Sequence, residues 1–126
     1  MTKEAILLVE ADILVRHPLA EYLRDCGYIV VEAASAAEAR ALVSSGELSF
    51  DGALVDAASV GDEAFAFVQW LRQSHPATSV SITGNIEKIA NQAVKLCHDA
   101  PSLTKPLDHR AVLDQIKRML AARQRR

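Results

Sequence analysis

The chain has 126 residues, of which half are apolar and 24% are charged. This length suits one domain, and the composition excludes an intrinsically disordered chain. No apolar run approaches the roughly 18 residues that cross a bilayer, and the first residues lack the pattern of a secretory signal. We therefore expect a cytoplasmic protein of one domain, over residues 1–126, with no membrane contact.

Charge and cysteine content point to no special partner. The net charge is −2, but from Arg110 onward there are six basic residues and a single acid, Asp114. A basic helix end complements the helix dipole, so this segment is interpreted as a solvated helix end, and nucleic acid is not an expected partner. Cys26 and Cys97 stand far apart within helical patterns, which favours reduced thiols over a disulfide.

The first quarter of the chain alternates between strand and helix patterns. Residues 5–9 form a continuous apolar run, which is typical of a strand buried on both faces. A helical pattern follows and ends at Gly27, a natural helix stop. Pro18 lies inside this pattern and predicts a late start or a bend. Residues 28–31 form the second strand candidate.

The same alternation continues to the end of the chain. Ser35 and Glu38 match a capping box, in which each side chain accepts a hydrogen bond from a backbone N–H of the other residue. The further elements follow from apolar runs, helical spacing and breaker residues. A strand is expected at 51–56, then a loop with Gly61 and a helix marked by Phe65, Val68 and Leu71. A strand at 80–83, a helix over 86–97, a weak strand at 103–104 and a helix from 108 to 120 complete the order.

Five strand–helix pairs with short connections predict an α/β fold. Alternation of this kind favours a parallel sheet covered by helices on both faces, a three-layer sandwich. In such sheets ligands bind at the carboxyl ends of the strands. The residues that end or follow these strands are Glu10, Asp56, Thr83 and Lys105, so we expect them at one edge of the sheet.

These four residue types support phosphoryl chemistry. A carboxylate such as Asp56 can attack a phosphoryl group, and Mg²⁺ held by hard oxygen ligands would offset the repulsion between the two anions. Lys105 could pair with a phosphoryl oxygen, and Thr83 could donate a hydrogen bond to another. No glycine-rich phosphate loop or nucleophile elbow is present, which disfavours a nucleotide binder or a small enzyme.

The chain resembles the receiver domains of response regulators in bacterial two-component signalling. The matching stretches are Ile-Leu-Leu-Val-Glu at 6–10, the strand that ends at Asp56, Ile-Thr-Gly at 82–84 and Thr-Lys-Pro at 104–106. The resemblance implies a flavodoxin-like (βα)5 fold with strand order 2-1-3-4-5. It also implies that Asp56 receives a phosphoryl group from a histidine kinase or phosphotransfer protein, and that Thr83 and Lys105 respond to it.

The resemblance further implies a metal site and an output surface. Glu10, Asp56 and the backbone carbonyl of Ala58 would hold Mg²⁺. The output would pass to a protein partner or a second copy through a face made by the fourth helix, the fifth strand and the fifth helix of the predicted order. The protein would be a signalling module without enzymatic activity of its own.

The sequence departs from the family pattern at three positions. Ala11 stands where the family has a second metal-binding carboxylate, Ser102 replaces an aromatic switch residue, and Val60 replaces a usual proline. The small residues after Asp56 suggest an easily hydrolysed phosphate. These departures keep an alternative open, in which a degenerate receiver works as a docking or dimerisation module without phosphorylation.

Overall fold

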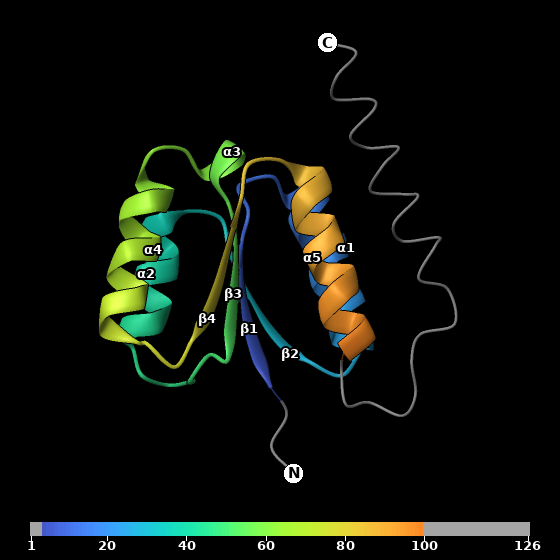
Figure 1. Cartoon of the computed structure of the whole chain (residues 1–126), viewed down its shortest axis with the longest axis horizontal. Coiled ribbons are helices and arrows are strands. Elements are labelled where there is room, and N and C mark those ends of the chain that lie inside the picture. The colour runs from blue at the N-terminus through green and yellow to red at the C-terminus, as the bar shows by residue number, and fades with distance from the viewer. Residues whose placement is uncertain (1–3, 100–126) are drawn as a thin grey trace.

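The computed structural model describes residues 4–99, which form a parallel sheet with helices on both faces (Figure 1). The strand order is β2-β1-β3-β4. In chain order the elements are β1 (Ala5–Val9), α1 (Ile13–Asp25), β2 (Ile29–Ala33), α2 (Ala36–Ser44), β3 (Gly52–Asp56), α3 (Ala57–Val60), α4 (Glu63–Ser74), β4 (Ser79–Thr83) and α5 (Ile86–Asp99). The α/β class and the first four places of the predicted order are confirmed.

The two central strands are buried along their whole length, as their continuous apolar runs predict. All five residues of β1 and all five of β3 are buried. Because alternate residues of a strand point to opposite faces, β1 divides between two cores. Ile6 and Leu8 pack under α1 and α5, and Leu7 and Val9 pack under α2 and α4.

Side chains fix where the helices begin. Asp12 caps α1 by accepting from the Leu14 N–H at 2.9 Å. Ser35 caps α2 by accepting from Glu38 at 3.1 Å, while the Glu38 carboxylate accepts from the N–H of Ala34, one residue before the position of a full capping box. Both caps satisfy N–H groups that the first helical turn leaves without a partner.

Several predictions need correction or stay outside the described residues. Pro18 does not delay α1, which begins five residues earlier at Ile13. The loop expected after Asp56 is a short helix, α3, because the Asp56 side chain caps it.

Other predictions concern residues that the structure does not describe. The strand at 103–104, the last helix, Ser102 and Lys105 lie outside residues 4–99. Within this range, no helix is long and apolar enough to cross a membrane.

The prediction of separate reduced thiols is wrong for this structure. Cys26 and Cys97 form a disulfide, with their Cα atoms 5.3 Å apart. Helices α1 and α5 cover the same face of the sheet (Figure 1), and the two cysteines stand near the ends of these helices. The long sequence separation therefore says nothing about their distance in the fold.

Candidate functional site

Three of the predicted site residues meet at the carboxyl edge of the sheet. Asp56 is the last residue of β3 and pairs in register with Thr83, the last residue of β4. On the other side, Val9 of β1 pairs with Val55, so Glu10 follows beside Asp56. The sequence prediction that these side chains share one edge is confirmed for Glu10, Asp56 and Thr83.

The same three residues continue one face of the sheet. Glu10 follows Ile6 and Leu8 at a spacing of two residues, and Asp56 follows Leu54 in the same way. Ile6, Leu8 and Leu54 all belong to the core under α1 and α5. Since strand side chains alternate between faces, the acidic pair lies at the end of the α1 and α5 layer.

Asp56 combines a structural contact with a free acceptor. Its Oδ1 accepts a hydrogen bond from the N–H of Ala58 at 3.1 Å and so caps α3. Its Oδ2 is buried and accepts no hydrogen bond from an N–H or hydroxyl group among residues 4–99, which leaves the neighbouring Glu10 carboxyl as the group able to donate a proton to it. A buried acceptor without a partner costs about 1–3 kcal/mol, which marks this oxygen as one that a ligand or proton donor would satisfy.

The surroundings of Glu10 change the protonation of its carboxyl group. Its side chain is fully buried, and this burial, together with a hydrogen bond and the negative charge of Asp56, raises its pKa from 4.5 to about 8. The hydroxyl of Ser59 and the backbone N–H of Asp12 oppose this rise. At neutral pH the Glu10 carboxyl therefore holds its proton and can share it with Asp56.

Ser59 is a site residue that the sequence did not predict. Its hydroxyl donates to Glu10 Oε2 at 2.5 Å and accepts from the N–H of Ala11 at 3.1 Å. Ser59 thus joins α3 to the end of β1 and contacts the acidic pair through Glu10. The only signal in the sequence was a hydroxyl three residues after the capping aspartate, within a run of small residues.

Thr83 and Ala58 occupy positions that suit their predicted roles. The Thr83 hydroxyl is buried and donates to the Val55 carbonyl at 3.4 Å, a weak bond that a better acceptor could replace. Ala58 is exposed in α3 beside Asp56. Lys105 is not among the described residues, so its approach to the site stays a prediction.

The donor set at this edge has two carboxyl groups that suit Mg²⁺. In proteins Mg²⁺ is usually held by one or two carboxylates together with water or phosphate oxygens. Glu10 and Asp56 supply two carboxyl groups, and Asp56 Oδ2 has no competing donor among the described residues. Among these residues no group of three His, Cys, Asp or Glu side chains gathers for a metal. The residues fit Mg²⁺ with one carboxylate fewer than the family pattern has.

The comparisons with known proteins bear on the fold. No protein-family model and no curated protein sequence matches the chain significantly. Among solved structures, a CheY-like response regulator receiver domain from Methanospirillum hungatei is 22% identical, with 98% of each chain covered and a TM-score of 0.60. The chemotaxis response regulator CheY4 of Vibrio cholerae is 26% identical, with 93% of this chain and 98% of that chain covered and a TM-score of 0.57.

The chain has the fold of a response regulator receiver domain. The resemblance in the sequence is thereby confirmed. A structure named adenylate cyclase from Rhodopirellula baltica also matches, at 22% identity over 98% of this chain and 96% of that chain, with a TM-score of 0.59. At this level of identity the likeness carries the receiver fold alone, and the chemistry has to be argued from the side chains.

Proposed function

We propose that this receiver domain accepts a phosphoryl group on Asp56 from a histidine kinase or phosphotransfer protein. The observation that carries the proposal is the buried Asp56 Oδ2, which receives no hydrogen bond from an N–H or hydroxyl group among residues 4–99 and lies at the edge where Glu10 and Thr83 meet. A carboxylate oxygen in this place can act as a nucleophile. The module signals to a protein partner or a second copy and has no enzymatic output of its own.

The transfer uses a small number of groups. An Asp56 carboxylate oxygen attacks phosphorus as the bond to the phosphohistidine nitrogen of the donor breaks, and that nitrogen leaves with the electron pair. Glu10, Asp56 and the carbonyl of Ala58 would hold Mg²⁺, which when bound offsets the repulsion between the carboxylate and the phosphoryl oxygens. Lys105 would pair with a phosphoryl oxygen once the C-terminal segment supplies it.

Ser59 and Glu10 control access to Asp56. The hydroxyl of Ser59 bridges Glu10 and the N–H of Ala11 beside Asp56, and a turn of this hydroxyl would widen the approach for a phosphoryl donor or water. Glu10 must also give up its proton before it can act as an anionic ligand. Both steps favour a slower acceptor than a site with two adjacent, charged carboxylates.

Thr83 connects the site to the output surface. Its weak bond to the Val55 carbonyl is easily exchanged for a bond to a phosphoryl oxygen. That exchange would pull Thr83 toward Asp56 and bias α5 toward one of two arrangements. The output face would comprise α5 with the predicted strand at 103–104 and the predicted last helix. We propose that the module works in the cytoplasm.

A second function is favoured by the incomplete acidic site. Alanine at position 11 and the absence of any group of three metal-ligating side chains among residues 4–99 are the features expected of a receiver that binds metal weakly. Such a protein would dock or dimerise without phosphorylation.

Intact-mass measurement separates the two functions. The wild type and Asp56→Asn are incubated with acetyl phosphate, with and without Mg²⁺. One phosphoryl adduct on the wild type alone, absent without Mg²⁺, supports the phosphoacceptor. A folded protein that takes no adduct at any Mg²⁺ concentration supports the docking module. Ser59→Ala should accept faster than the wild type if the hydroxyl restricts access.

A further inference from the structure

We propose that Cys26 and Cys97 form a site of reversible oxidation. The disulfide anchors the C-terminal end of α5, and through α5 it restrains Thr83 at the end of β4. The restraint on α5 follows from the described contacts. Its effect on phosphorylation rests on the proposed function.

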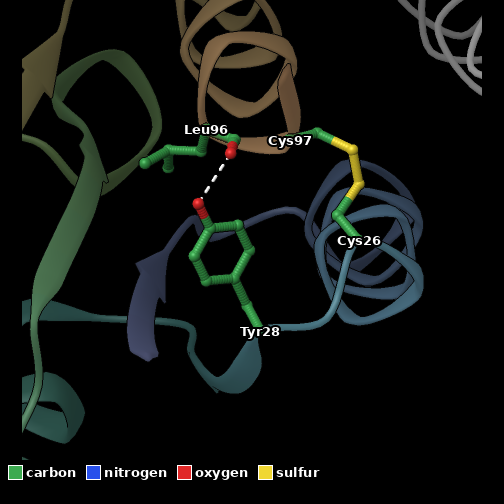
Figure 2. Close-up of a disulfide and its surroundings, with 4 residues drawn as sticks. All are labelled: Cys26, Tyr28, Leu96 and Cys97. Atoms are coloured by element: carbon green, nitrogen blue, oxygen red, sulfur yellow. Dashed lines mark hydrogen bonds between the residues drawn. A yellow bond between two sulfur atoms is a disulfide. The ribbon is translucent and has the colours of Figure 1, made fainter. Parts of the chain in front are cut away.

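The two cysteines join the ends of neighbouring helices. Cys26 is the C-terminal cap of α1, and its N–H bonds to carbonyls of the last turn. Cys97 stands two residues before the end of α5. Their Cα separation of 5.3 Å lies within the 4.4–6.8 Å usual for disulfides. Figure 2 shows the bond crossing directly from one helix to the other.

A second contact holds the same end of α5. The hydroxyl of Tyr28 donates to the Leu96 carbonyl at 2.6 Å (Figure 2). Tyr28 is two residues after Cys26. The short segment between α1 and β2 therefore contacts the last turns of α5 twice, by a disulfide and by a hydrogen bond. Cys26, Cys97 and Tyr28 are all buried in the core under α1 and α5.

The opposite end of α5 is close to the candidate site. Asn85 caps the helix by accepting from the Lys88 N–H at 2.8 Å, and only Gly84 separates Asn85 from Thr83. An α-helix of this length is a stiff rod of about 20 Å. A displacement of Thr83 that is passed on through Gly84 and Asn85 would tilt α5, and the closed disulfide fixes the end about which the helix would tilt.

The oxidation is a two-electron step. Two thiols lose two protons and two electrons and gain one S–S bond, while a small-molecule disulfide such as oxidised glutathione is reduced to two thiols through a mixed disulfide. Both cysteines are 0% exposed in the closed state. A thiolate reductant therefore reaches the bond only when the end of α5 lifts, so the rate of reduction reports that motion.

The expected compartment favours a reversible bond over a permanent one. In a reducing cytoplasm disulfides are rare, and those that occur are commonly catalytic or redox-sensing. Linkage requires reciprocity: if the closed bond disfavours the phosphorylated arrangement, phosphorylation must make the pair easier to reduce by the same factor.

Hydrogen exchange tests the anchor without any phosphate. The protein is equilibrated in glutathione buffers, its thiol state is fixed by alkylation and mass, and amide exchange is compared between the two forms. We expect the last turns of α5 to be accelerated in the reduced form at least about 10-fold more than the buried amides of α4, whose exchange measures the general loss of stability. A pair that never closes, or equal exchange of α5 in both forms, overturns the proposal.

Adduct formation with acetyl phosphate tests the coupling. We expect the reduced wild type to accept several-fold faster than the oxidised form, and Cys26→Ser/Cys97→Ser to accept equally in both buffers. Equal rates for the two wild-type forms overturn the coupling.

The failure of the proposed function is distinguishable from the failure of the oxidation site. No adduct in any form overturns the coupling together with the proposed function, while faster α5 exchange still supports the oxidation site. If the serine variant does not fold, Tyr28→Phe replaces it. This variant keeps the disulfide but loses the hydrogen bond to Leu96. In the oxidised form, the C-terminal end of α5 should exchange faster in Tyr28→Phe than in the wild type.

Discussion

The two helix layers of the sheet are held by different means. The layer of α1 and α5 is cross-linked by Cys26–Cys97 and by the Tyr28–Leu96 hydrogen bond. The layer of α2 and α4 has no such bond among the described residues and depends on apolar packing, with Phe67, Val68 and Leu71 buried against the sheet.

The difference follows the placement of the polar site. Glu10 and Asp56 continue the face under α1 and α5, so that layer contains a buried acceptor without a partner and a carboxyl group removed from water. Both are costly, and the disulfide lies in the same layer. The comparison teaches that costly polar burial and a covalent cross-link occur in one layer, while the other layer has well-packed apolar side chains.

The largest expected effect comes from removing the cross-link. Cys26→Ser/Cys97→Ser should lower the free energy of unfolding by about 4 kcal/mol, the chain-entropy value for a closed loop of this size. Urea unfolding of the oxidised wild type and the variant gives the difference. The reduced wild type is the matched control and should resemble the variant. A difference below about 1 kcal/mol would show that the layer of α1 and α5 is held by packing, like its counterpart.

The opposite layer should respond to the loss of packing instead. Phe67 is buried, so Phe67→Ala should cost about 3 kcal/mol through the lost apolar contacts and the cavity left behind. Phe65 stands two residues earlier on α4 with 64% of its surface exposed. Phe65→Ala is therefore the control and should change stability by less than about 0.5 kcal/mol. Similar losses for both variants would contradict the described orientation of α4.

A smaller effect is expected from the ion pairs between α1 and β2. Although burial alone would raise the pKa of Glu32, hydrogen bonds from His17 and Arg16 and the charge of Arg24 outweigh it and lower the pKa. The carboxylate therefore stabilises the fold above pH 4.5, and this contribution is lost as the pH falls through the lowered pKa.

Glu32→Gln should accordingly cost about 1 kcal/mol at pH 7, and the cost should shrink below pH 4. Glu21→Gln, with its side chain 52% exposed, is the control and should be nearly neutral. Thermal melts at pH 7 and pH 3.5 measure both. A cost for Glu32→Gln that does not depend on pH would refute the assigned role of its charge.

At the acidic pair the expected effect is close to zero at pH 4 and grows as the pH rises. The pKa of Glu10 is raised to about 8 in the folded state, so wild-type stability should fall as the pH rises from 4.5 through 8, because the folded state binds more protons than the unfolded state. Glutamine copies the neutral carboxyl. Glu10→Gln should thus change stability by less than about 1 kcal/mol at pH 4, where Glu10 is neutral in both states, and by pH 7 it should exceed the wild type by more than about 1.4 kcal/mol, the value of one pKa unit. Parallel pH profiles would contradict a protonated Glu10.

The sequence predicted what depends on local pattern. Apolar runs identified β1 and β3, and their boundaries placed Glu10, Asp56 and Thr83 at one edge. It did not predict α3 or the role of Ser59, because a four-residue helix depends on one capping contact and leaves no periodic signal. It also missed the disulfide, since the proximity of Cys26 and Cys97 arises only when α1 and α5 pack on a common face. Lys105 and the fifth strand stay predictions.

The single tryptophan has an optical consequence. Trp70 lies on α4 between Phe67 and His75, with the guanidinium of Arg40 from α2 4.6 Å from its ring centre. Its emission therefore senses the α2–α4 contact and is insensitive to events confined to the other layer. A fluorescence titration that stays flat on addition of Mg²⁺ would say nothing about binding at Asp56, whereas a change in emission on phosphorylation would show that the signal crosses the sheet.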